Sequence, residues 1–273
     1  QQHSAQRSFS FYPGVGYRHL CVWHGGIASL RTTPPHDITG REIACYLPQG
    51  DGAETLLTLM HESRELLERH PVNEKRRSLG EKLVSSIWLW GQGGAPRIQP
   101  LTEKYSLKGA VISAVDLLNG TGTYAGLRVI RVAGATGYID TNYQGKANAA
   151  LQALESGDDF VLVHVEAPDE MGHEGNLKGK IKAIEDFDKL VVGTILEGLP
   201  DFGDYRVMVL SDHLTPIALK THTADPTIFA AWSSATKKNR HPDLSFSESC
   251  AKQGGLLISP GHLLFEAFIH GRL

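Results

Sequence analysis

An aspartate and a histidine four residues apart follow an apolar, strand-like run of the chain. The run, Phe160–Val165, breaks at Pro168 and is followed by Asp169 and His173. If the chain becomes helical after the proline, this spacing places both side chains on one face of the helix. A carboxylate beside an imidazole suits a divalent metal such as Mn²⁺ or Zn²⁺. The alternative is a helix amino terminus with an acidic first turn and a solvated histidine.

A second aspartate–histidine pair follows another short apolar run, Val207–Leu210. Asp212 and His213 are adjacent, and neighbours on an extended chain point to opposite sides, so the pair suits two ions better than one. A third histidine, His222, lies in a Thr-His-Thr sequence before the strand-like run Pro226–Trp232. The chain has 13 histidines, about twice the usual share, so chance clustering is the alternative.

Two aspartates and three histidines at three strand ends make most of a site for two metal ions. They do not complete it, because two ions of four- to six-fold coordination need further carboxylates, water or a nucleophile. The sequence therefore predicts a two-metal site with a deficit of ligands. A further histidine, His164, lies inside a predicted strand, and we expect it to be a core residue and not a ligand.

The elements that must position these residues alternate between helix and strand after Pro100. The patterns predict, in chain order, a helix over 110–118, a strand over 129–132, a helix over 143–155, strands at 160 and 207, and a strand at 227. Between 160 and 207, one long amphipathic helix carries the stripe Ile181, Ile184, Asp188, Val191 and Ile195. Such alternation predicts an α/β fold with a mostly parallel sheet flanked by helices. Ligands of such sheets bind beyond the carboxyl ends of the strands, where the aspartate–histidine pairs fall.

Before Pro100 the pattern is that of an α+β domain. Strands are predicted at 17–23 and 86–90, a loop at 32–40, and a helix at 54–68.

Composition excludes some classes of function and favours one compartment. The net charge is −3, which predicts no general affinity for nucleic acid or anionic membranes. Three widely spaced cysteines imply neither a disulfide framework nor a cysteine-based metal site. Neither a run of 18 apolar residues nor a signal-peptide core is found, and we expect a cytoplasmic protein.

Several stretches resemble the cofactor-independent phosphoglycerate mutases of the archaeal type, within the alkaline phosphatase superfamily. They are V-H-V-E-A-P-D-E-M-G-H-E-G, L-S-D-H, T-H-T, F-Y-P-G-V-G-Y-R-H-L, T-T-P-P-H-D-I-T-G, W-L-W-G-Q-G, Y-S-L-K-G-A-V-I-S-A-V-D-L-L and G-A-T-G-Y-I-D-T. The resemblance runs from about Phe9 to the carboxyl terminus. It implies an alkaline phosphatase-like core with part of an inserted substrate-binding domain.

The resemblance also implies a ligand set for two divalent ions. One ion would be bound by Asp169, His173 and His222, and the second by Asp212 and His213. Mn²⁺ is the first expectation, with Zn²⁺, Mg²⁺ and Co²⁺ as alternatives.

Members of the family are longer than this chain. Their amino-terminal segment supplies a further aspartate ligand and the serine nucleophile, so the chain reads as a fragment with no catalytic nucleophile of its own. We expect residues 1–104 to be the end of the inserted substrate-binding domain and residues 105–273 to be part of the metal-binding domain. The 273 residues alone are expected to be inactive.

The activity that the resemblance implies is interconversion of 3-phosphoglycerate and 2-phosphoglycerate, in glycolysis and gluconeogenesis, through a phosphoserine. Two metals suit phosphoryl transfer because the transferred group carries charge. The substrate, a small phosphorylated three-carbon acid, needs cationic contacts, for which Arg18 and Lys104 are the candidates. His36 and Asp37 follow as further candidate contacts. The alternative is that these four residues are ordinary surface charges. A metal-dependent phosphatase or phosphomutase of the same superfamily is the alternative function, and the oligomeric state is open.

Overall fold

The computed structural model describes residues 9–14, 17–236 and 244–273. The chain divides into two compact units, Gln1–Arg97 and Ile98–Leu273. This division falls a few residues before the domain boundary predicted at residue 104. The interpretation of the two units as substrate-binding and metal-binding domains stays a prediction.

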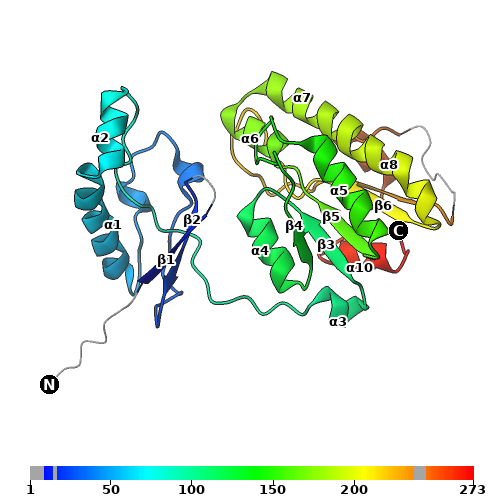
Figure 1. Cartoon of the computed structure of the whole chain (residues 1–273), viewed down its shortest axis with the longest axis horizontal. Helices are drawn as coiled ribbons and strands as arrows, with labels where there is room; N and C mark the ends of the chain where they lie inside the picture. The colour runs from blue at the N-terminus through cyan, green and yellow to red at the C-terminus, as the bar shows by residue number, and fades with distance from the viewer. Residues whose placement is uncertain (1–8, 15–16, 237–243) are drawn as a thin grey trace. The chain divides into compact units, whose positions relative to one another are not determined.

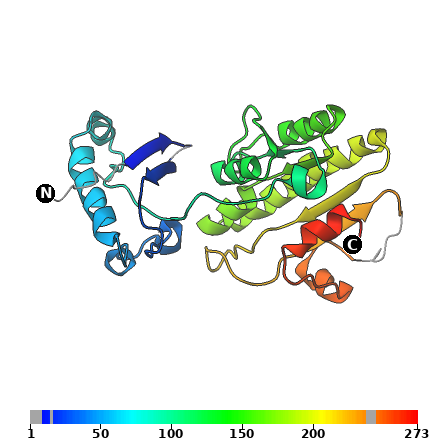
Figure 2. The ribbon, with the colours of Figure 1, turned by 90° about the horizontal axis from the view of Figure 1, so that it is seen from below.

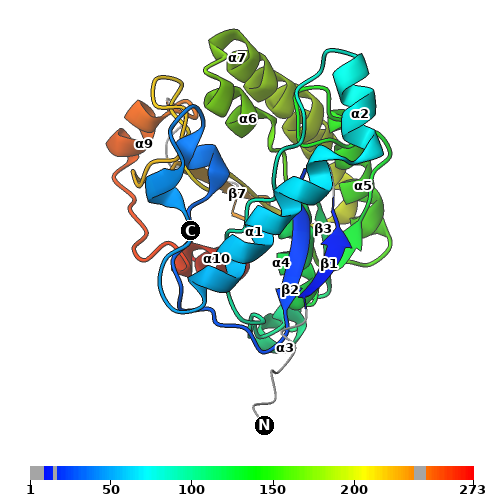
Figure 3. The same ribbon diagram turned by 90° about the vertical axis from the view of Figure 1, so that its left-hand side faces the viewer.

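The first unit combines a β-hairpin with two helices. Strands β1 (Phe9–Pro13) and β2 (His19–Trp23) are antiparallel, and the rings of Phe9 and Trp23 stack across them at 5.4 Å. Helix α1 (Ala53–Glu68) lies beside the hairpin and is followed by α2 (Pro71–Ser78) (Figures 1 and 3). The strand predicted at 17–23 and the helix predicted at 54–68 are confirmed. The predicted loop at 32–40 contains a short 3₁₀ turn, Pro35–Ile38.

The strand predicted at 86–90 is wrong. All of residues 81–100 are described, and they form neither helix nor strand. The backbone of this segment instead bonds to side chains: Asn73 exchanges two hydrogen bonds with Val84, at 2.7 and 2.9 Å, and Ile87 N–H donates to Ser63 Oγ at 3.1 Å. Hydrogen bonds to side chains of α1 and α2 thus hold this partly buried segment in place of pairing in a sheet.

The second unit is built on a parallel sheet of three strands in the order β4-β3-β5. These are β3 (Gly109–Ile112), β4 (Arg128–Ile130) and β5 (Phe160–Val163). The α/β class with a parallel sheet and flanking helices, as predicted, is confirmed. The helix predicted at 110–118 is wrong, because Ala110, Val111 and Ile112 form the fully buried central strand, and α4 (Asp116–Tyr124) begins after it. A short apolar run cannot be assigned to strand or helix by periodicity alone.

Helices cover both faces of this sheet. Val163 packs with Ala147 of α5 (Tyr143–Glu155), whereas the ring of Phe160 meets Phe265 of α10 (Leu263–Ile269) at 5.3 Å. Residues an odd number apart on a strand point to opposite faces, so α5 and α10 lie on opposite sides, as Figure 2 shows. Alanines at the contacts let α5, α6 (Ala167–Glu174) and α7 (Leu177–Asp186) pack closely.

The long helix predicted between 160 and 207 is present, with an irregular middle. Helix α7 passes through a π-helical stretch, Phe187–Gly193, into α8 (Thr194–Gly198) (Figure 1). Its buried residues are Ala183 and Val191, while Ile181 and Ile184 are each 49% exposed. The wider turn of the π-helix shifts the buried face away from the first half of the predicted stripe.

The last strands pair with each other and not with the parallel sheet. Strands β6 (Arg206–Leu210) and β7 (Phe229–Ser233) form a separate antiparallel pair. The prediction that they complete a mostly parallel sheet is therefore wrong for these two strands. Two short helices complete the unit, α3 (Leu101–Tyr105) and α9 (Glu248–Gly254). Among the described residues, no helix is long and apolar enough to cross a membrane.

We expect Ile112→Ala to destabilise the second unit by about 2–4 kcal/mol, because the change leaves a cavity in the central strand. Ile112 is 1% exposed. Urea unfolding followed by circular dichroism measures the loss. Leu117→Ala is the matched control, since Leu117 is 74% exposed and its truncation should cost less than about 0.5 kcal/mol. Equal losses in the two variants would contradict the assignment of β3 as the core strand.

Candidate metal centre

Helix α6 presents Asp169 and His173 side by side at the carboxyl end of β5. Pro168 occupies its first turn, where the missing N–H costs nothing, and Gly175 ends the helix with φ of 73°. His173 Nε2 lies 3.3 Å from Asp169 Oδ2. The predicted helix after Pro168, with both side chains on one face, is confirmed.

The segment after β6 returns a second group of side chains to the same place. An isolated bridge between Leu214 and Thr223 turns the chain back, so that the His213 and His222 rings lie 3.8 Å apart. His222 Nε2 is 3.1 Å from His173 Nε2. Residues about 50 positions apart in the sequence thus meet at one point beyond the strand ends.

The spacing of these atoms fits the ligands of one ion. An ion with bonds of about 2.1 Å holds neighbouring ligand atoms about 3.0–3.4 Å apart, from octahedral to tetrahedral geometry. Asp169 Oδ1 lies 3.4 Å from His222 Nε2, and the other oxygen, Oδ2, lies 3.3 Å from His173 Nε2. The two Nε2 atoms lie 3.1 Å apart. One carboxylate and two imidazoles suit Mn²⁺ or Zn²⁺.

The tautomer of His173 also fits a ligand role. Its Nδ1 lies 3.0 Å from the carbonyl oxygen of Lys220, which can only accept, so Nδ1 carries the proton. In the neutral ring the lone pair of Nε2 then faces Asp169 and His222. Metal-ligating histidines usually have their other ring nitrogen fixed in this way.

His213 lies closer to this group than the resemblance implies. Its Nδ1 is 3.9 Å from Asp169 Oδ1, and ligand atoms of Asp169, His213 and His222 all lie within 4.8 Å of one another. The side chain of Asp212 is 73% exposed, and its Oδ1 accepts the backbone N–H of His213. Assignment of Asp212 and His213 to a second ion stays a prediction.

Sequence reasoning missed one buried residue at the cluster, Thr215. It is 4% exposed, and its hydroxyl donates a hydrogen bond to Asp169 Oδ1. The residue lies two positions after His213, so an extended chain would place both on one side, which is the pattern that could have identified it.

His164 belongs to a separate polar network beside the cluster. Its half-buried ring joins Ser113 Oγ, 3.0 Å from Nδ1, to Glu166 Oε2, 3.1 Å from Nε2. The ammonium group of Lys146, a residue only 1% exposed, donates to the carbonyl oxygen of His164 at 3.1 Å. Burial lowers the pKa of Lys146 from near 10.5 to about 8, opposed by the charge of Glu166.

The four candidate substrate contacts are distributed over both units. In the first unit, the Arg18 guanidinium lies 5.2 Å from the Tyr17 ring, and His36 Nε2 lies 4.0 Å from Asp37 Oδ1. In the second, Lys104 Nζ lies 4.9 Å from the Tyr105 ring, and a hydrogen bond to that residue raises the pKa of Lys104. Their role in binding substrate stays a prediction.

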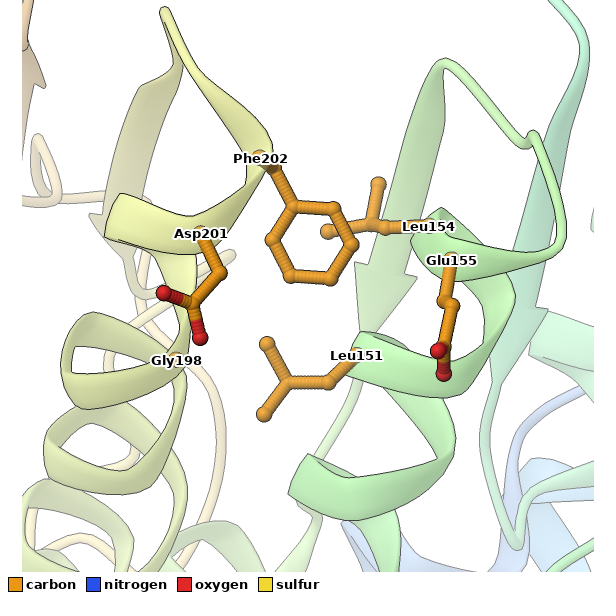
Figure 4. A pocket seen from close by; sticks show the side chains of 6 residues that line it. All are labelled: Leu151, Leu154, Glu155, Gly198, Asp201 and Phe202. Atoms are coloured by element: carbon orange, nitrogen blue, oxygen red, sulfur yellow. The ribbon is translucent and has the colours of Figure 1, made fainter.

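A surface pocket of about 490 Å³ lies away from the cluster (Figure 4). Its lining comes from the end of α5 and the turn after α8: Leu151, Leu154, Glu155, Gly198, Asp201 and Phe202. The end of α5 leads into the start of β5, whereas the metal cluster follows the end of β5. The pocket is therefore not the candidate site.

Comparison with protein families gives a match over residues 14–265 to the model described as metalloenzyme superfamily. The chain belongs to the metalloenzyme superfamily. This membership implies use of divalent metal, in agreement with the cluster at Asp169.

Curated relatives within this superfamily carry names that agree with the sequence motifs. A protein of Geobacter sulfurreducens named probable 2,3-bisphosphoglycerate-independent phosphoglycerate mutase is 52% identical over 261 residues, which are 96% of this chain and 65% of the relative. A Methanosarcina mazei protein with that name, without "probable", is 50% identical over 248 residues, 90% of this chain and 62% of the relative. The chain thus spans less than two thirds of the length of these relatives.

Solved structures give the same fold. A Pyrococcus horikoshii protein matches with a TM-score of 0.62 and 30% identity, covering 74% of this chain and 52% of that one. A cofactor-independent phosphoglycerate mutase from Thermoplasma acidophilum matches with a TM-score of 0.54 at 23% identity, covering 97% of this chain and 65% of that one. The second match supports the fold alone.

We expect the stability of the protein to rise with pH between about 8 and 10.5 through Lys146. In this window the unfolded chain binds a proton that the buried amine has lost, so the free energy of unfolding increases with pH. Lys146→Met should abolish this contribution. Urea midpoints measured from pH 7.5 to 10 compare the variant with the wild type.

Lys178→Met is the control, because Lys178 is an exposed lysine of α7 and should leave the rise unchanged. Parallel pH profiles for wild type and Lys146→Met would contradict the depressed pKa.

Proposed function

We propose that the protein to which this chain belongs interconverts 3-phosphoglycerate and 2-phosphoglycerate through a phosphoserine, with divalent metal. One observation carries the proposal: Asp169, His173 and His222 converge with the spacing of ligands of one ion. The convergence occurs in a chain about 50% identical to proteins named phosphoglycerate mutases. We expect two ions, with Mn²⁺ first, and we propose that the protein acts in glycolysis and gluconeogenesis in the cytoplasm.

The chain's own residues would hold and orient the metal. Asp169 supplies negative charge, and the proton on His173 Nδ1, donated to Lys220 O, keeps Nε2 available as a ligand. Divalent metal held there would supply positive charge to offset the charge on the phosphoryl group and on the attacking and leaving oxygens. Following the family resemblance, we assign the nucleophilic serine to the part of the relatives that this chain does not cover, and not to Thr215, whose hydroxyl donates to Asp169.

The substrate would need further positive charge to bind its phosphate and carboxylate. Arg18 and Lys104 are proposed for this role, because guanidinium and ammonium groups make charge-assisted hydrogen bonds to such anions. His36 and Asp37, adjacent in a 3₁₀ turn of the first unit, are proposed as secondary contacts.

Metal content separates the two proposed ion sites. Elemental analysis of the chain equilibrated with Mn²⁺ should find at least one ion per chain. We expect Asp169→Ala to abolish tight binding, because the carboxylate lies within 3.4 Å of both His173 and His222. Asp212→Ala should keep the first ion, because that carboxylate is 73% exposed and bonded within its own turn.

His61→Ala is the control for loss of a histidine, since His61 is exposed on α1 in the first unit. Retention of the metal by Asp169→Ala, or its loss from His61→Ala, would contradict the assignment of the cluster.

Activity is best tested in a chimera. This chain would replace the matching region of the Geobacter sulfurreducens relative, which leaves the uncovered third of that protein in place. We expect the chimera to form 2-phosphoglycerate from 3-phosphoglycerate in an enolase-coupled assay, and the 273 residues alone to form none. Asp169→Ala in the chimera should reduce the rate at least about 100-fold, since the metal stabilises the charge of the transition state.

The same assay separates the mutase from a metal-dependent phosphatase of the superfamily. Release of inorganic phosphate without formation of 2-phosphoglycerate would favour the phosphatase. Robust mutase turnover by the 273 residues alone would show that the chain carries its own nucleophile.

A further inference from the structure

The candidate metal ligands lie on two parts of the fold that share no strand pairing among the described residues. Asp169 and His173 follow β5 of the parallel sheet, whereas His213 and His222 follow β6 of the antiparallel pair. Ligand atoms must be held within a few tenths of an ångström for tight binding. Contacts outside the sheets must therefore align the two halves.

The hydrogen bond between His173 Nδ1 and the carbonyl oxygen of Lys220 is one of these contacts, and Thr215 makes another. It is 4% exposed, and its hydroxyl donates to Asp169 Oδ1 while lying 3.3 Å from His213 Nδ1. The hydroxyl thus touches one side chain from each half. A hydroxyl that donates to a carboxylate oxygen occupies one lone pair of that oxygen and restrains the orientation of the carboxylate, so that the other lone pairs keep a defined direction.

Lys180 holds the backbone of Thr215 in place. Its Nζ donates to the carbonyl oxygen of Thr215 at 2.6 Å, from helix α7. Burial lowers the pKa of Lys180, and the neighbouring carboxylates of Asp169 and Glu248 oppose that effect. The ammonium group therefore links α7 to the segment that carries His213.

Gly172 permits the same segment to approach α6. A Cβ atom on Gly172 would lie 2.6 Å from the carbonyl oxygen of Thr215 and 2.9 Å from its Cγ2. Real side chains do not come this close to backbone oxygen. The backbone of α6 is thus in direct contact with Thr215 one turn from Asp169.

We infer that Thr215 is a positioning residue that joins the two halves of the metal centre, with Lys180 and Gly172 as its anchors. The inference rests on the proposed function, since the group that Thr215 orients is a candidate metal ligand. Such outer contacts typically change metal affinity 10- to 100-fold when removed. Thr215 itself need not touch the ion.

Metal affinity of hydroxyl variants tests this role. Thr215→Val keeps the shape of the side chain and removes the hydroxyl, so we expect Mn²⁺ affinity, measured by titration calorimetry, to fall about 10-fold or more. Thr215→Ser restores the hydroxyl and should recover affinity to within about 3-fold. A purely structural role would not be rescued by serine, which lacks the methyl group.

Thr141→Val is the matched control. Thr141 is a buried threonine, 5% exposed, whose hydroxyl accepts the N–H of Thr136 at 3.0 Å within a separate loop. The Thr141→Val variant should bind Mn²⁺ with the affinity of the wild type. Wild-type affinity in Thr215→Val, or an equal loss in Thr141→Val, would overturn the inference.

Hydrogen exchange of the metal-free protein separates this inference from the proposed function. Thr215→Val and Lys180→Met should each speed exchange of the amides around 213–215 and at the start of α6, because the joint between them is weakened. Unchanged exchange would overturn the positioning role of Thr215 even if the wild type binds metal. If the wild type fails to bind Mn²⁺ but the variants exchange faster as expected, the result counts against the mutase proposal. The role of Thr215 in joining the two segments would then remain supported.

Discussion

The contact between α6 and the segment after β6 is the interaction on which the candidate site depends. The parallel sheet and the antiparallel pair contribute their own ligands, and each set is incomplete alone. The Thr215 hydroxyl, the Lys180 ammonium and the Cβ-free surface of Gly172 bring them together. Each of these contacts is buried or half-buried, where hydrogen bonds are stronger and more costly to lose.

The core beneath the site fixes α6 itself. Ala147, Ala167 and Ala183 are fully buried where α5, α6 and α7 meet, and small side chains let helices approach closely. Helix α6 therefore has a fixed axis as it leaves β5, and Asp169 on its first turn inherits that position. The network of Ser113, His164 and Glu166 ties the ends of β3 and β5 immediately before it.

A bound metal would take the place of a hydrogen bond between two histidines of the cluster. Within a few ångströms the cluster brings the carboxylate of Asp169 together with imidazole nitrogens, and the Nε2 atoms of His173 and His222 face each other at 3.1 Å. With its proton on Nδ1, the neutral His173 ring accepts at Nε2, so His222 donates a proton from its own Nε2 when this contact is a hydrogen bond. Either that proton or a bound cation can lie between the two nitrogens, and a cation agrees with membership of a metalloenzyme superfamily.

The sequence by itself determined features that depend on residues close together along the chain. Pro168 and the spacing of Asp169 and His173 fix a helix with both side chains on one face, because helix geometry repeats every 3.6 residues. The alternation after Pro100 gave the α/β class, and the motifs gave the superfamily. Residues 110–112 were misassigned because a short buried run has no periodicity to read.

Only the tertiary structure decided which residues from distant segments meet. The pairing of β6 with β7, the placement of His213 beside Asp169, and the burial of Thr215 depend on contacts between segments far apart in sequence. The irregular path of 81–100 likewise follows from side chains of other elements that bond its backbone. Such contacts are set by packing and hydrogen-bond satisfaction over the whole unit, and no local pattern encodes them.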